Sequence, residues 1–162
     1  MINEPRSSAG QVAQGKRREQ DAPLSVLFVC TANICRSPFM ELLARHLAGP
    51  DSLVEFFSAG IHGFVDRPMD DIMATTLLPR GIVGAGSFRS RPLTGELIER
   101  ADLVLTAETA HRSFILDEHP ASFRTVFTLG QFVNATRGVA PTLHGRPLLA
   151  EVGQHRGLAD PT

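Results

Sequence analysis

The chain of 162 residues carries a formal net charge of −1, with 43% hydrophobic and 20% charged residues. That length suits one domain with a substantial core, and the composition is typical of a soluble globular protein. The near-zero charge gives no general attraction to nucleic acid or to an anionic membrane. The two cysteines, Cys30 and Cys35, are too few for a disulfide framework. A reactive thiol is best kept in a reducing compartment, so we expect a cytoplasmic protein.

The first 23 residues differ in composition from the rest. They are rich in Gln, Ser, Gly, Arg and Glu and contain almost no large apolar side chains, which predicts a disordered leader. They include no apolar stretch typical of a secretory signal, and the chain has no run of about 18 or more apolar residues that would span a membrane. We expect one domain over residues 24–162, with a short C-terminal segment.

From residue 24 onward, strand and helix patterns alternate. The continuous apolar run 24–29 is typical of a central parallel strand. Residues 38–48 predict a helix with one apolar face, ending before Gly49. Further strands are expected at 53–57, 103–106 and 125–129, and further helices at 70–78, 96–100 and 108–116. Segment 138–158 predicts a long loop with some helix. The alternation predicts an α/β fold, a single-domain doubly wound sandwich with a four-stranded parallel sheet.

A chemical motif lies between the first strand and the first helix. Cys30 ends the strand, and Arg36 follows after five intervening residues. The carboxyl edge of an open parallel sheet is where such proteins bind ligands. The short loop 31–35 can turn its backbone N–H groups inward as an anion nest, and the helix N-terminus adds partial positive charge there. We therefore expect a phosphate-binding loop after the first strand.

The residue types in this loop favour nucleophilic chemistry. A helix N-terminus and an arginine favour the thiolate form of Cys30, which is the attacking form. Arg36 offers a planar pair of donors that fits two phosphate oxygens. Ser37 suits an N-cap and could donate to the thiolate, and Pro38 suits the first helical position. Spacing alone also fits an ordinary buried cysteine followed by a surface arginine, but the strand–loop–helix context favours a cysteinyl-phosphate intermediate.

Residues 30–38 resemble the loop of the low-molecular-weight protein tyrosine phosphatase family, Cys-x-Gly-Asn-x-Cys-Arg-Ser-Pro. Ala32 stands where the family usually has glycine, so it must avoid positive φ or bear an energetic cost. The likeness extends over residues 24–162. It continues in the Ser-Ala-Gly at 58–60, in the segments 89–94 and 101–105, and in the Asp-Pro at 160–161.

The resemblance implies roles for individual residues. Phosphate would be bound by the loop, namely Thr31, Ala32, Asn33, Ile34, Cys35 and Arg36. Support would come from Asn33, Ser37 and Ser58, and Phe64 would form a wall of the substrate site. Asp160 would be the general acid, and Asp117, which is more typical of a helix end, is the weaker alternative. Phe88 stands where many relatives carry a supporting histidine. Cys35 either forms a protective disulfide with Cys30 after oxidation or only fills space under the loop.

Together these roles predict hydrolysis of aryl phosphate monoesters, with a phosphotyrosine protein or another aryl phosphate as substrate. The expected mechanism needs no metal or cofactor, because Arg36 and the loop amides would neutralise phosphate charge. Two alternatives stay open. A thioredoxin-coupled arsenate reductase would need further cysteines, and none follows Cys35. A non-catalytic phosphate-binding module would result from a degraded acid loop.

Overall fold

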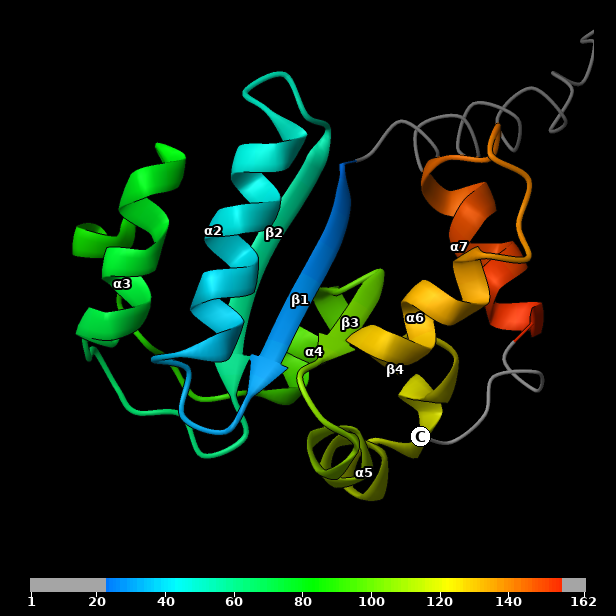
Figure 1. Cartoon of the computed structure of the whole chain (residues 1–162). Coiled ribbons are helices and arrows are strands. Elements are labelled where there is room, and N and C mark those ends of the chain that lie inside the picture. The colour runs from blue at the N-terminus through cyan, green and yellow to red at the C-terminus, as the bar shows by residue number, and fades with distance from the viewer. Residues whose placement is uncertain (1–22, 156–162) are drawn as a thin grey trace, which may run out of the picture.

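The computed structural model describes residues 23–155. The predictions for the leader up to residue 22 and for Asp160 lie outside the described residues. Within them, four strands form one parallel sheet in the order β2-β1-β3-β4 (Figure 1). The strands are β1 (Leu24–Cys30), β2 (Val54–Gly60), β3 (Leu103–Thr106) and β4 (Val126–Thr128). The predicted four-stranded parallel sheet in an α/β fold is confirmed.

Helices connect the strands and cover both faces of the sheet. Those described are α2 (Arg36–Ala48), α3 (Asp71–Leu77), α4 (Gly95–Arg100), α5 (Thr109–Glu118), α6 (Leu129–Thr136) and α7 (Gly145–Gln154). Three short 3-10 turns lie at Leu78–Arg80, Ala85–Ser87 and Pro120–Arg124. None of these helices is long and apolar enough to cross a membrane.

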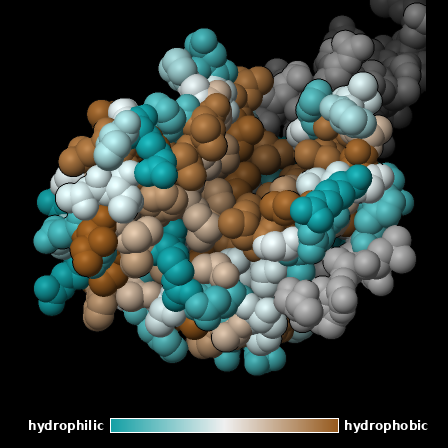
Figure 2. Space-filling view, viewed as in Figure 1, coloured by the Kyte–Doolittle hydropathy of each residue, from teal (hydrophilic) through white to brown (hydrophobic). Residues whose placement is uncertain are grey.

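Alternate residues of the central strands point to opposite faces of the sheet and belong to two apolar cores. Leu27, Val29 and Val104 point to one face and pack with Ile98 of α4 and Ile115 of α5. The opposite face carries a second cluster, with contributions from α2, α6 and α7: Val26, Phe28, Leu103, Leu105, Phe127, Ala135 and Val152, with Met40 and Ala44 against it. Because β1 and β3 are buried on both faces, they read as continuous apolar runs in the sequence. Figure 2 shows apolar side chains gathered over the hollow between α2 and the α6–α7 pair.

The structure corrects several predicted boundaries. Strand β2 continues to Gly60, so the Ser-Ala-Gly segment lies inside the strand rather than after it. Helix α6 was not predicted. Thr128 begins it with a capping box, since its hydroxyl accepts from the Gln131 backbone while the Gln131 side chain accepts from the Thr128 backbone. The segment expected to be mainly loop contains α7, which starts at Gly145.

Candidate active site

The candidate site lies where the direction of strand connection reverses. β1 pairs with β2 on one side and with β3 on the other, and ligands bind at the carboxyl edge of such a switch point. Cys30 is the last residue of β1, is only 2% exposed, and pairs with Gly60 at the end of β2. A Cβ at Gly60 would lie 2.6 Å from the Thr31 carbonyl oxygen, so glycine is required for the close approach of the two segments.

The loop turns its carbonyl groups outward. The carbonyl oxygens of Cys30, Thr31 and Ala32 accept hydrogen bonds from the segment after β2. The donors are the backbone N–H groups of Ile61 at 3.0 Å, His62 at 2.9 Å and Phe64 at 3.2 Å, and Ile34 accepts in the same way from Asp70 at 2.7 Å. In a trans peptide the N–H points opposite to the C=O, and no peptide bond of residues 23–155 is cis. The N–H groups in the same peptide units, those of Thr31, Ala32, Asn33 and Cys35, therefore point away from this segment, toward the side on which an anion nest would form.

Backbone strain in the loop falls on Asn33 and not on Ala32. Asn33 has φ of 56°, and in the described part of the chain the only other non-glycine residue with positive φ is Asp66. Asparagine tolerates this left-handed conformation better than most residues. Ala32 thus avoids the conformation that would have made its replacement of glycine costly.

A buried network of polar side chains supports the loop from below. Asn33 Nδ2 donates to Ser37 Oγ and to Ser58 Oγ, both at 2.9 Å, and Asn33 Oδ1 accepts from the Arg91 backbone N–H at 2.9 Å. That backbone bond fixes which way the amide faces. Ser37 Oγ accepts from Asn33 and still has its own hydrogen to donate. The distance from Ser37 Oγ to Cys30 Sγ is 3.0 Å. The geometry thus offers a hydroxyl donor to a thiolate at Cys30.

This use of Ser37 differs from the predicted helix cap. Helix α2 already begins at Arg36, with Cys35 as N-cap and no side-chain capping bond. Ser37 and Pro38 therefore lie inside the first turn. The missing N–H of Pro38 still costs nothing there, since the first turn has no intrahelical acceptors.

Glu41 and Arg91 are supporting residues that the sequence reasoning missed. Glu41 is 4% exposed, accepts from Ser58 Oγ, and pairs with Arg45 at 2.6 Å. Burial raises the pKa of the Glu41 carboxyl, and the Ser58 hydrogen bond and the Arg45 charge oppose that rise. Arg91 Nε donates to the Ser58 carbonyl at 2.9 Å. The only sequence signal was the i,i+4 spacing of Glu41 and Arg45 on the helix.

Phe88 does not join this network. It packs into a third apolar cluster with Leu42, Leu77 and Ile82. A carboxylate from α2, Glu41, contacts Ser58 instead.

The outer rim of the loop carries a second set of contacts. Arg36 forms an ion pair with Glu108, which follows β3, and both side chains are about half exposed. Thr31 Oγ1 lies 2.9 Å from Nε2 of His111, which is 2% exposed. The His111 Nδ1 atom has no partner within residues 23–155. Burial lowers the pKa of His111, the Arg36 charge lowers it further, and Glu108 opposes both.

Phe64 and Ile34 lie together beside the loop. They line a cavity of about 450 Å³ with Arg67, Pro68, Met69, Asp70 and Asp71, and Phe64 is half exposed. Cys35, at the end of the loop, is partly buried. Burial raises the pKa of its thiol, as do the charges of Asp70 and Cys30, whereas Arg36 lowers it. Cys35 is therefore held as the neutral thiol.

Of the remaining predicted positions, Asp117 does not join the loop. Asp117 is an exposed residue in the last turn of α5, in keeping with its helix-end reading, and Asp160 lies outside the described residues. No group of three or more His, Cys, Asp or Glu side chains in residues 23–155 is arranged to hold a metal ion.

Comparison with known proteins bears on the same loop and fold. The family described as low molecular weight phosphotyrosine protein phosphatase matches residues 25–144. The chain belongs to this family. A probable low molecular weight protein-tyrosine-phosphatase, EpsP from Ralstonia nicotianae, is 38% identical over 108 residues, which cover 66% of this chain and 71% of that protein. A protein-arginine-phosphatase from Bacillus subtilis is 34% identical over 116 residues, covering 71% of this chain and 76% of its own length.

Solved structures of this phosphatase family share the fold. The YwlE arginine phosphatase from Geobacillus stearothermophilus superimposes with a TM-score of 0.64 at 32% identity, covering 85% of this chain and 86% of that one. The tyrosine phosphatase Wzb from Escherichia coli K30, in complex with sulphate, gives 0.60 at 27% identity, with 83% and 92% covered. The relatives thus include both tyrosine and arginine phosphatases.

Proposed function

We propose that this phosphatase hydrolyses phosphotyrosine in proteins through a cysteinyl-phosphate intermediate. The observation that carries the proposal is the loop itself. The amides whose peptide carbonyls bond residues 61–70 point away from that segment, Ser37 approaches the sulfur of Cys30 at 3.0 Å, and Arg36 stands at the rim. Such preorganised donors stabilise charge as it develops in the transition state.

The first step transfers the phosphoryl group to sulfur. The Cys30 thiolate attacks phosphorus in line, the S–P bond forms, and the bond from phosphorus to the tyrosine oxygen breaks. The loop amides and Arg36 hold the three equatorial oxygens, for which Arg36 must exchange its Glu108 contact for the phosphate. Asp160 gives its proton to the leaving phenolate, a contribution of about 10²–10⁴ in rate.

The second step releases inorganic phosphate. Asp160, now ionised, takes a proton from water as the water attacks phosphorus, and the S–P bond breaks to regenerate the thiolate. The Ser37 hydroxyl stabilises that thiolate as leaving group and nucleophile alike. With water as the co-reactant, the protons and electrons of the two steps balance.

The cavity beside the loop supports an aryl substrate. Ile34 and Phe64 give it apolar surface, and an aromatic ring gains from burial there. A second candidate is phosphoarginine. It is supported by the arginine phosphatases among the relatives and by Asp70 and Asp71, which could pair with a guanidinium in the same cavity. A cytoplasmic location is also proposed, because the mechanism needs a reduced Cys30.

Two assays test these proposals. p-Nitrophenyl phosphate hydrolysis at mildly acid pH should be measurable for the wild type and lost in Cys30→Ser, and absence of turnover would leave the non-catalytic binding module. Matched peptides that carry either phosphotyrosine or phosphoarginine should differ in kcat/KM by at least about tenfold in favour of phosphotyrosine, about 1.4 kcal/mol. The reverse order would assign the arginine substrate.

Asp160 is tested by varying the leaving group. Asp160→Asn should slow hydrolysis of aryl phosphates with poor leaving groups much more than of those with good ones, because only poor leaving groups need the proton. Asp117→Asn is the matched control and should leave both rates unchanged. A uniform loss across leaving groups in Asp160→Asn would indicate a structural role.

A further inference from the structure

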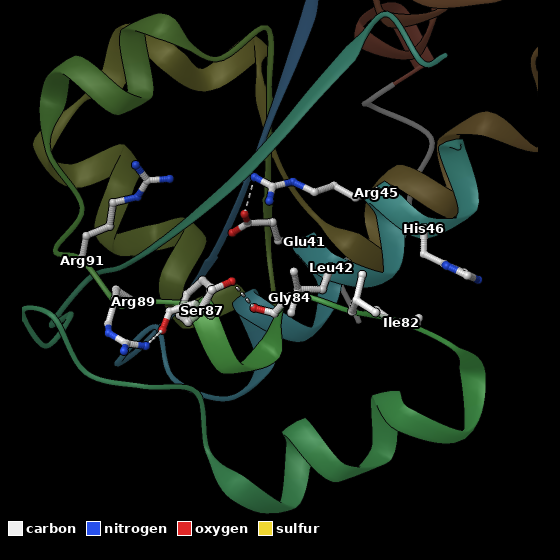
Figure 3. Close-up of a pocket in the computed structure, with 11 residues that line it drawn as sticks. Glu41, Leu42, Arg45, His46, Ile82, Gly84, Ser87, Arg89 and Arg91 are labelled. Atoms are coloured by element: carbon white, nitrogen blue, oxygen red, sulfur yellow. Dashed lines mark hydrogen bonds and ion pairs between the residues drawn. The ribbon is translucent and has the colours of Figure 1, made fainter. Parts of the chain in front are cut away.

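A second cavity lies on the other side of the supporting network, between α2 and the segment 82–91 (Figure 3). Its volume is about 540 Å³, within the usual range of small-molecule sites of about 300–1,000 Å³. Figure 3 shows Glu41 and Arg45 side by side in its wall. Glu41 is the residue that accepts from Ser58 in the network below the loop. The cavity therefore adjoins the catalytic loop without opening through the phosphate nest.

The lining of this cavity is basic although the whole chain is nearly neutral. Three arginines line it, Arg45, Arg89 and Arg91, against the single carboxylate of Glu41. Arg89 donates to the carbonyls of Gly86 and Phe88, and its contact with Asp66 is long, at 3.9 Å.

Arg91 is likewise satisfied by neutral groups. It donates to the Ser58 carbonyl and lies 5.8 Å from the centre of the Phe57 ring. Among the described residues, the 3.9 Å contact with Asp66 is the one ion pair of Arg89. Arg91 forms no ion pair within 4 Å there, although its charge acts on the Glu41 carboxyl. Guanidinium groups placed in this way suit an anion with planar oxygens.

The remaining wall is apolar. Leu42, Ile82 and Phe88 belong to the third cluster and line the cavity, and Val83 beside them is 86% exposed. Gly84, with φ of 106°, turns the chain there, and a side chain at this position would be strained. A ligand that fits both walls has a negatively charged group and a short apolar body.

We propose that this cavity binds a small organic anion, a carboxylate or phosphate with a short apolar body, and that the bound anion lowers phosphatase activity through Arg45 and Glu41. The binding site stands independently of the proposed function, whereas the effect on activity rests on it. The anion would draw Arg45 from its 2.6 Å pairing with Glu41. A buried carboxylate that loses its counter-charge is strongly destabilised, so Glu41 would move or take up a proton.

Either response reaches the nucleophile through consecutive hydrogen bonds. Glu41 contacts Ser58, Ser58 contacts Asn33, and Asn33 fixes Ser37 against Cys30. The effect should appear mainly in kcat, because the phosphate nest itself stays open to substrate. By linkage, an anion that leaves the affinity for phosphate unchanged must itself bind equally well when phosphate occupies the loop.

Binding is tested with benzoate as the probe and benzamide as its neutral control. In the full chain with saturating phosphate, benzoate should shift the amide resonances of residues 82–91 and of α2, with a Kd of about 1 mM. Benzamide should not shift them. Arg89→Gln should weaken benzoate by about fivefold or more. Arg80→Gln should leave it unchanged, because this exposed arginine follows α3 and, within residues 23–155, its side chain donates to the Thr76 carbonyl.

The effect on catalysis is tested with p-nitrophenyl phosphate. Benzoate should inhibit noncompetitively in the wild type, and the inhibition should weaken in Arg89→Gln but not in Arg80→Gln. Purely competitive inhibition, displacement of benzoate by phosphate, equal binding of benzamide, or no change in Arg89→Gln would each overturn the proposal. If benzoate shifted the resonances of a protein that showed no phosphatase activity, the anion site would stand and the proposed function would be rejected, because the resonance shifts measure binding without turnover.

Discussion

The two sides of the phosphate-binding loop are built differently. On the outer rim, Arg36 and Glu108 form an ion pair with side chains 42% and 56% exposed. Below the loop, Asn33, Ser37 and Ser58 are completely buried, and Glu41 is 4% exposed. Exposed ion pairs contribute about 0–1 kcal/mol and exchange partners readily, whereas buried polar groups are costly whenever a partner is lost. The rim can therefore release Arg36 to a substrate while the network below keeps the loop in one shape.

This contrast predicts that rim variants lose activity while keeping stability, and that variants of the buried network lose both. Each experiment below changes one side of the loop and measures both properties.

The largest effect is expected at the nucleophile. Cys30→Ser should lower kcat by at least about 10⁴-fold, because a serine hydroxyl at this position has no base to activate it. Equilibrium binding of phosphate should be kept within about threefold, since the amides and Arg36 remain. Cys35→Ser is the control and should keep most of the activity. Turnover near the wild-type rate in Cys30→Ser would exclude a cysteinyl-phosphate.

The next effect is expected at the rim. Arg36→Lys should lower kcat/KM by about 10²–10³, because an ammonium cannot contact two phosphate oxygens at once. The free energy of unfolding should change by less than about 1 kcal/mol. Arg100→Lys alters an exposed ion pair of the same kind, with Glu55, and should affect neither quantity. Unchanged kinetics in Arg36→Lys would mean that Arg36 does not bind phosphate.

Asn33→Ala tests the buried side of the comparison. It leaves Ser37, Ser58 and the Arg91 N–H each short of a partner and places alanine at positive φ. We expect a loss of about 2–4 kcal/mol in denaturant unfolding, together with at least about tenfold lower kcat. Asn134→Ala, an exposed change in α6, should do neither. If Asn33→Ala lost activity but kept the wild-type free energy of unfolding, the buried network would behave like the rim, and the contrast between the two sides would be wrong.

Oxidation tests whether Cys35, at the end of the loop, protects Cys30 or only packs beneath it. Its thiol is held neutral by burial and nearby negative charge, so Cys30 should be oxidised first and Cys35 should then condense with the sulfenic acid. After peroxide and dithiothreitol, the wild type should recover several times more activity than Cys35→Ser. Mass spectrometry should detect a Cys30–Cys35 disulfide. Equal recovery without a disulfide would leave Cys35 as a packing residue.

The smallest effect concerns His111, which is buried although it belongs to the rim. Its folded pKa lies below the ordinary value of about 6.5, so its contribution to stability is present above that value and is lost as pH falls through the folded pKa.

The free energy of unfolding of the wild type should therefore fall more steeply between about pH 7 and 5 than that of His111→Phe. At pH 7.5 the variant should lose about 1 kcal/mol with the Thr31 hydrogen bond. His144→Phe, an exposed control, should keep the wild-type slope. Parallel slopes in all three proteins would show that His111 does not titrate differently on folding.

What the sequence determined by itself was local. The loop 30–38 is contiguous, so Cys30, Arg36 and Ser37 could be assigned together, and the apolar runs of β1 and β3 showed buried parallel strands. Helix α6 was not predicted, because the sequence favoured a strand up to residue 129. The Thr128 capping box that starts the helix overlaps the end of that predicted strand.

Only the tertiary structure decided which side chains surround the loop. Glu41 reaches Ser58 across 17 positions, Arg91 reaches Asn33 across 58, and His111 reaches Thr31 across 80. Such partners leave no periodic or spacing signal, because their positions depend on how the strands are ordered and how closely Gly60 lets two segments approach. A contiguous motif such as the loop can be recognised from neighbouring residues. The burial and hydrogen bonds that hold it in place arise only when distant segments pack together.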